Sequence, residues 1–188
     1  MIAKNNLREQ VNAWQDVSLV VAVGDITGGF GTVAEYAYAK DYFSRLRHPY
    51  TVITGNHDFM YADGTNLNGK NFVRTVLDLD DYIYADIGAL SLHWPWAKKE
   101  VRQQKLDRFR RLFSLDSLYY SKRLGPCLLI FLSPDMVSDN KYQLQFSHQQ
   151  LEWLRAELAV NKNMPTIVFS HAPLKGTLHS NVDRANTV

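Results

Sequence analysis

Two kinds of hydrophobic pattern alternate along the chain. Continuous apolar runs rich in β-branched residues predict buried strands over 17–23, 50–54, 128–132 and 166–169. Apolar residues spaced three or four positions apart predict helices over about 7–15, 32–46 and 97–115. A fourth helix is expected after Ser147, where Gln150 suggests a capping box and Leu151, Leu154 and Leu158 are expected to face inward. This alternation predicts an α/β fold of helices layered on largely parallel strands, with the first two strands forming a parallel pair.

The middle of the chain departs from this alternation. The stretch over 61–71 is rich in Gly and Asn and predicts a long surface loop. The helix over 97–115 has an apolar stripe, and the rest of it is basic, with Lys or Arg at positions 98, 99, 102, 105, 108, 110 and 111. Such a run is typical of a solvated helix face, although near a phosphate site it would also suit an anionic substrate. We expect a loop and helix cap over about 60–120, with its basic residues in solvent.

Composition predicts a single globular domain over 1–188. The chain is 46% hydrophobic and 21% charged, which excludes disordered and low-complexity classes. Cys127 is the single cysteine, so no internal disulfide is expected, and its apolar neighbours predict a buried thiol. The formal net charge of +2 gives no indication of nucleic acid as a partner. No apolar run approaches the roughly 18 residues of a membrane helix and no signal segment is visible, so we expect no membrane partner and take the cytoplasm as the default location.

Polar residues follow three of the predicted strands. Asp25 follows the first, Asn56, His57 and Asp58 follow the second, and His171 follows the last. Ligands bind at the carboxyl ends of strands in open α/β sheets, so we expect these side chains to gather at one site. Carboxylate, amide and imidazole groups together suit zinc, manganese or iron.

The motifs that hold these residues resemble those of a known enzyme family. Gly24-Asp25, Gly55-Asn56-His57-Asp58 and Ser170-His171-Ala172-Pro173 resemble three of the five sequence blocks of calcineurin-like metallophosphoesterases. The resemblance implies a metallophosphatase-like layered sandwich, with mixed, largely parallel sheets flanked by helices. It also implies hydrolysis of a phosphomonoester or phosphodiester by a hydroxide that two divalent metals activate.

Each site residue takes a role from this resemblance. Asp25 resembles the carboxylate that bridges two divalent ions (Mn, Fe or Zn), and Asn56 and His171 resemble ligands of one ion. His57 resembles the histidine that contacts the phosphate and protonates the leaving oxygen, and Asp58 resembles the residue that orients it. A carboxylate beside an imidazole fixes its tautomer and raises its basicity, as a general acid requires.

Two of the family's five blocks have no counterpart here. Asp-x-His is missing before the first predicted strand and Gly-His-x-His after the last, and His179 does not replace the latter. The resemblance therefore implies a fragment, truncated at both ends, whose activity is impaired, because a site with three protein ligands is usually weak. The alternative interpretation is a non-catalytic binding or scaffolding relative of the same fold that has lost metal ligands. Neither the substrate nor the oligomeric state follows from the sequence.

Overall fold

The computed structural model describes residues 2–62, 96–137 and 144–171 of the chain. Its helices are α1 (Ile2–Ala13), α2 (Val33–Ser44), α3 (Asn56–Phe59), α5 (Lys99–Leu112) and α6 (His148–Val160), and its strands are β1 (Val20–Val23), β2 (Tyr50–Ile53), β3 (Tyr120–Leu124), β4 (Cys127–Leu132) and β5 (Thr166–Ser170). Most of the predicted loop over 61–71 lies outside these ranges, as does about half of the predicted cap over about 60–120. No helix in the described ranges is long and apolar enough to cross a membrane.

The strands form two small sheets. β1 and β2 are parallel, as the strand, helix and strand pattern of the first half predicted, and α2 connects them. In the second sheet β4 lies between β3 and β5, antiparallel to β3 and parallel to β5. The fold is thus a mixed α/β arrangement, as expected for the metallophosphatase-like sandwich.

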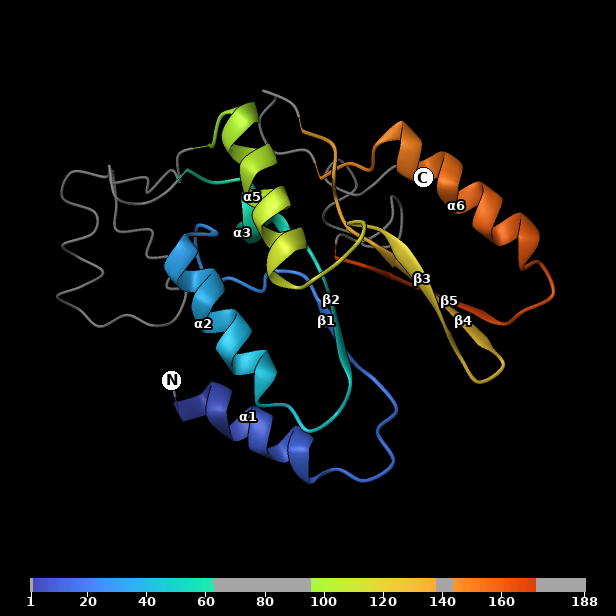
Figure 1. Cartoon of the computed structure of the whole chain (residues 1–188), viewed down its shortest axis with the longest axis horizontal. Helices are drawn as coiled ribbons and strands as arrows, with labels where there is room; N and C mark the ends of the chain where they lie inside the picture. Colours follow the sequence, from blue (N-terminus) through green and yellow to red (C-terminus); the bar gives the residue numbers. More distant parts are fainter. Residues whose placement is uncertain (1, 63–95, 138–143, 172–188) are drawn as a thin grey trace, which may run out of the picture.

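Alternation along β4 shows how the layers are stacked. Leu128, Ile130 and Leu132 pack against α6, whereas Leu129 and Phe131 pack against Ile53 of β2. Successive side chains of a strand point to opposite faces, so β4 separates a helix layer from the other sheet. Figure 1 shows α6 beside β3, β4 and β5, and α1, α2 and α5 on the side of β1 and β2.

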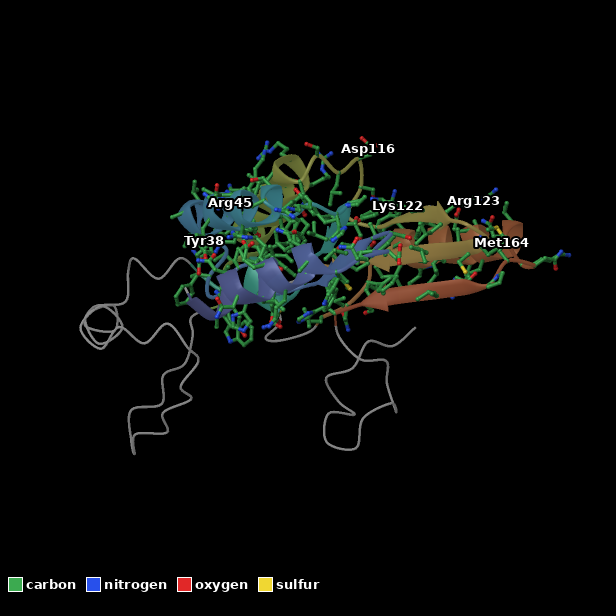
Figure 2. All side chains as sticks on the ribbon, turned by 90° about the horizontal axis from the view of Figure 1, so that it is seen from below. Tyr38, Arg45, Asp116, Lys122, Arg123 and Met164 are labelled. Carbon is green, nitrogen blue, oxygen red and sulfur yellow. The ribbon has the colours of Figure 1, made fainter. Side chains whose placement is uncertain are left out.

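A second cluster fixes the helices on the first sheet. Tyr36 of α2 and Phe109 of α5 are almost fully buried against Val52 of β2. Seen from below in Figure 2, side chains fill the space between these helices and the strands, with Arg45 and Tyr38 toward one end and Lys122, Arg123 and Met164 toward the other. The order of layers is therefore helices, β1 and β2, the second sheet, and α6.

Helix starts follow local sequence closely. Thr32 caps α2 by accepting from the Glu35 N–H, and the Glu35 carboxylate accepts from the Thr32 N–H, which completes a capping box. Ser147 caps α6 by accepting from the N–H of Gln150. The expected return contact from Gln150 is absent, because its side chain donates to the Ser133 carbonyl of the loop after β4.

Five burial predictions are wrong. Val23 is 41% exposed at the carboxyl end of β1, although the apolar run over 17–23 predicted a buried strand. Ile167 and Val168 of β5 are about half exposed (50% and 48%), because β5 lies at the edge of its sheet in the described part of the chain. Leu158 is exposed near the end of α6, and Cys127 is only half-buried at the start of β4. The fifth correction concerns the basic helix, where Arg102 and Lys105 are only 2% and 1% exposed rather than in solvent.

Candidate metal centre and active site

The loops after β1, β2 and β5 meet at one point. Nδ1 of His171 lies 2.9 Å from the carbonyl oxygen of Val23, which ties the end of β5 to the end of β1. Nε2 of the same ring lies 3.2 Å from Oδ1 of Asn56 and 3.5 Å from Oδ1 of Asp25. The structure therefore brings together Asp25, Asn56 and His171, three residues that lie far apart in the sequence.

Two glycines make this approach sterically feasible. A Cβ atom on Gly24 would lie 2.3 Å from Nδ1 of His171, and a Cβ atom on Gly55 would lie 2.3 Å from Oδ1 of Asp25. Gly24 also has a φ of +82°, a backbone conformation that side chains with a Cβ rarely adopt. Asp25 itself has a φ of +51°, a region in which Asp and Asn are the usual non-glycine residues.

We expect the Gly55→Ala variant to lose about 2 kcal/mol of unfolding free energy, the usual scale of overpacking a close contact. Gly55 has an ordinary negative φ of −116°, so the effect would come from crowding of Asp25 rather than from backbone strain. The control is Gly28→Ala, whose added methyl meets no atom within 4 Å. Urea unfolding followed by tryptophan fluorescence measures both variants, and equal stability of the two would contradict the crowding.

Asp58 connects the loops that follow β1 and β2. Its Oδ2 accepts from the N–H groups of Gly55 (2.8 Å) and Ile26 (3.2 Å). Its Oδ1 accepts from the N–H (2.8 Å) and the hydroxyl (3.1 Å) of Thr27. Burial and the nearby Asp25 carboxylate raise the pKa of Asp58 to about 6 against the opposing effect of these N–H donors, so the group is ionised above that pH.

The predicted contact between Asp58 and the His57 ring is not formed. In the described part of the chain, all hydrogen bonds of the Asp58 carboxylate go to Gly55, Ile26 and Thr27. The reason is local geometry, since α3 places His57 and Asp58 on adjacent positions of a helical turn, and such neighbours do not face each other. Asp58 therefore positions His57 only through the backbone.

His57 is oriented by a backbone carbonyl instead. Its Nδ1 lies 3.1 Å from the carbonyl oxygen of Gly29, and its N–H donates to Oδ1 of Asp25 at 3.0 Å. A carbonyl only accepts, so Nδ1 carries the proton of the neutral ring and Nε2 is the nitrogen that gains or loses one. The ring also lies against Tyr61, with their centroids 5.1 Å apart.

The same rule applied to His171 indicates a cation site. Because Nδ1 donates to the Val23 carbonyl, Nε2 presents a lone pair to Oδ1 of Asn56 and Oδ1 of Asp25, which are acceptors too. Three acceptors repel one another unless a proton or a metal ion lies among them. In a metal site, bonds of about 2.0–2.2 Å hold neighbouring ligand atoms about 3–3.5 Å apart. The separations of Nε2 of His171 from Oδ1 of Asn56 and Oδ1 of Asp25 therefore fit three ligands of one divalent ion. Asn56 is needed in this set, since the described residues contain no group of three His, Cys, Asp or Glu that could hold a metal.

Comparison with known families agrees with this geometry. The family model of the calcineurin-like phosphoesterases matches residues 3–186. The chain belongs to this family. The comparison with curated proteins gives no match. Membership indicates a hydrolase of phosphate esters, and members of this phosphoesterase family generally bind divalent metals.

Several residues that surround the candidate site are not evident from its motifs. Thr27 is 1% exposed and adds its hydroxyl to the Asp58 network, and Tyr61 accepts from the side-chain amide of Asn56 at 3.2 Å. Gly29 acts through its carbonyl, which no side-chain pattern reveals. Lys105 was detectable, because it precedes Leu106 and lies four positions before Phe109, on the buried side of its helix.

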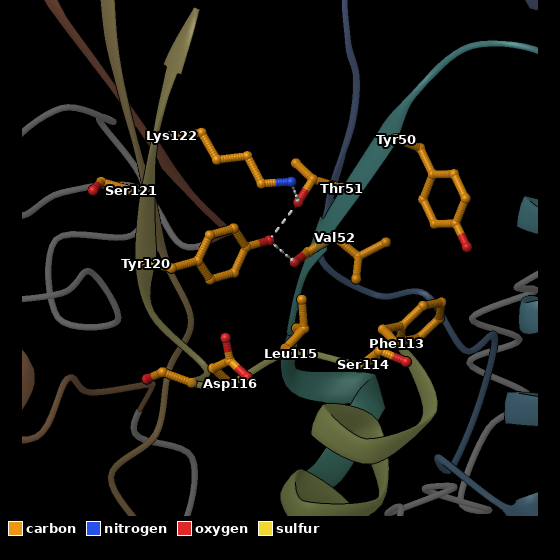
Figure 3. Close-up of a pocket in the computed structure, with 11 residues that line it drawn as sticks. Tyr50, Thr51, Val52, Phe113, Ser114, Leu115, Asp116, Tyr120, Ser121 and Lys122 are labelled. Atoms are coloured by element: carbon orange, nitrogen blue, oxygen red, sulfur yellow. Dashed lines mark hydrogen bonds between the residues drawn. The ribbon is translucent and has the colours of Figure 1, made fainter.

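A separate pocket lies away from these residues. It has a volume of about 340 Å³ and opens between the start of β2, the start of β3 and the segment after α5. In Figure 3 the hydroxyl of Tyr120 bonds to Thr51 and to the Val52 carbonyl, and Lys122 reaches Thr51. Thr51 lies at the amino end of β2 and the candidate metal ligands follow the carboxyl ends of their strands, so this pocket is separate from the candidate metal centre.

Proposed function

We propose that this phosphoesterase hydrolyses a phosphomonoester or phosphodiester with the help of divalent metal ions (Mn, Fe or Zn) held by Asp25, Asn56 and His171. The observation that carries the proposal is the convergence of three lone-pair atoms on the space between these side chains. A divalent ion bound there would polarise the phosphate and supply the attacking nucleophile from water. Asp25, which also accepts from the His57 N–H, would supply the carboxylate that holds the metal ions, the role that the family resemblance implies.

The remaining chemistry is assigned to His57. Hydrolysis places negative charge on the leaving oxygen, and a positioned acid that protonates this oxygen typically contributes 10²- to 10⁴-fold. With Nδ1 held by Gly29, the protonated ring would donate from Nε2 and then hold the neutral tautomer without turning. Asp58 supports this step by holding the loop that carries His57 against the loop that carries Asp25.

We expect manganese-dependent release of nitrophenol from p-nitrophenyl phosphate or bis(p-nitrophenyl) phosphate, abolished by a chelator and restored by added Mn²⁺. The assay should be run on this chain and on the product of the complete reading frame. Calorimetric titration with Mn²⁺ gives the matching binding measurement. Binding without turnover of either ester by either protein would overturn the catalytic proposal.

One observation favours the scaffold alternative. The described residues offer three metal donors and no cluster of three His, Cys, Asp or Glu, and a site with few ligands binds metal weakly. In a scaffold the same strand ends would carry a recognition surface rather than a reaction. Absence of both Mn²⁺ binding and turnover in the product of the complete reading frame would support this alternative.

A further inference from the structure

We propose that Lys105 is a positioning residue for His57, acting through the loop over 28–31. The inference rests on the proposed function only in that it gives His57 the acid role. Lys105 belongs to α5 and lies 44 positions beyond Tyr61 and 75 beyond Phe30 in the chain, yet its ammonium donates to the carbonyls of both residues. The contact to Tyr61 measures 2.6 Å.

The burial of Lys105 indicates that its ammonium is part of the structure rather than solvated. The side chain is only 1% exposed, on the same helix face as Leu106 and Phe109, which are fully buried. An ammonium in such a place is costly unless acceptors surround it. The carbonyls of Phe30 and Tyr61 supply such acceptors, which explains why a cation stands where the helical pattern expects an apolar residue.

The loop over 28–31 needs anchors of this kind. It contains Gly28, Gly29 and Gly31, so its backbone has few conformational restraints of its own. The peptide unit between Gly29 and Phe30 donates its N–H to Glu35 at 3.1 Å, and its carbonyl accepts from Nδ1 of His57. The carbonyl that orients the His57 ring therefore belongs to a peptide unit whose N–H is already fixed.

Two cations of α5 fix the peptide units that follow. The Phe30 carbonyl accepts from Lys105, and the Gly31 carbonyl accepts from Arg108 at 3.2 Å. With Phe30 held at its N–H by Glu35 and at its carbonyl by Lys105, the Gly29 carbonyl has little freedom to rotate away from His57.

Lys105 also acts on the other side of the His57 ring. It holds the Tyr61 backbone, and the Tyr61 ring packs on His57 and accepts through its hydroxyl from Asn56. One buried ammonium therefore fixes two neighbours of the proposed acid. This differs from a solvated basic face and from a group that attracts substrate, since the ammonium is not accessible.

The first test is Lys105→Met, which keeps an unbranched side chain one atom shorter and removes the charge and the N–H donors. We expect turnover of phenyl phosphate esters, which have a poor leaving group, to fall about tenfold, with a smaller effect on p-nitrophenyl esters because nitrophenolate leaves with little help from an acid. In a His57→Ala background the same substitution should have no further effect on turnover. A tenfold loss in both backgrounds would overturn the proposal. Lys98→Met, an exposed lysine just before the same helix, is the control and should leave turnover unchanged.

The second test does not depend on activity. In the metal-free chain, ¹⁵N NMR of His57 should show the Nδ1–H tautomer, and Lys105→Met should yield a mixture of both tautomers while Lys98→Met does not. A folded Lys105→Met variant with an unchanged tautomer would contradict the proposal, even if the chain hydrolyses no ester. If the methionine variant does not fold, Lys105→Gln, which removes the charge and has a side chain one atom shorter than lysine, should also give a mixture of tautomers. An unchanged tautomer in this variant would contradict the proposal.

Discussion

The Asp25→Asn variant should hydrolyse an aryl phosphodiester at least about a hundredfold more slowly than the parent protein, a loss of about 2.7 kcal/mol of transition-state stabilisation. The substitution keeps the size of the side chain and one oxygen that can accept from the His57 N–H, so the backbone contact at 3.0 Å can persist. It removes the negative charge that faces Nε2 of His171 at 3.5 Å. A neutral amide would hold divalent ions far less well than a carboxylate.

A matched control separates chemistry from backbone strain in this experiment. Asp16 also has a positive φ (61°, against 51° for Asp25) but is exposed before β1, so Asp16→Asn repeats the substitution in the same conformation outside the site. We expect Asp16→Asn to retain full turnover with added Mn²⁺. Full activity in Asp25→Asn would refute the bridging role of Asp25, and a loss shared by the two variants would assign the effect to backbone conformation.

The sequence predicted much of the fold because local patterns determine most of it. The apolar run over 128–132 predicted β4, whose alternating faces are both covered, by α6 and by the other sheet. The run over 166–169 predicted β5 equally well but gave the wrong burial. An apolar run specifies a strand, but only the pairing partners determine whether the strand lies at a sheet edge, and pairing is not a local property.

The sequence was enough to predict which residues gather at the candidate site, but not the contacts that orient their side chains. Asp25, Asn56 and His171 could be grouped because the carboxyl ends of parallel strands meet at one edge. The orientation of His57 could not, because it depends on a carbonyl of a glycine loop and on a lysine in a distant helix. Its charge led to the prediction that Lys105 lies in solvent. Its position four residues before the apolar Phe109 instead indicates the buried side of the helix, where Lys105 lies.

The Asp58→Asn variant should lose about 3 kcal/mol of unfolding free energy in the metal-free chain, since at least one buried N–H donor would lose its acceptor. An amide offers one oxygen and one NH₂ group, and both Asp58 oxygens accept from backbone N–H groups at a residue with no exposed surface. Whichever way the amide turns, its NH₂ group faces at least one N–H donor, of Gly55 or of Thr27. The two loops that this carboxylate joins would then separate.

Urea unfolding near pH 5, below the raised pKa of Asp58, measures this loss. The loss should shrink as the pH rises through about 6, because ionisation of the buried carboxylate costs the parent protein stability that the neutral amide does not lose. The control is Asp116→Asn, an exposed aspartate after α5, which should change stability by less than about 0.5 kcal/mol.

The experiment also bears on the choice between enzyme and scaffold. A large loss in metal-free protein would show that Asp58 holds the strand-end loops together before any ion binds, so the donors of Asp25 and Asn56 are prearranged by the fold. A loss below 1 kcal/mol would mean that the loops are held by other contacts, and the positioning of His57 would then depend on the α5 cations and Gly29 alone.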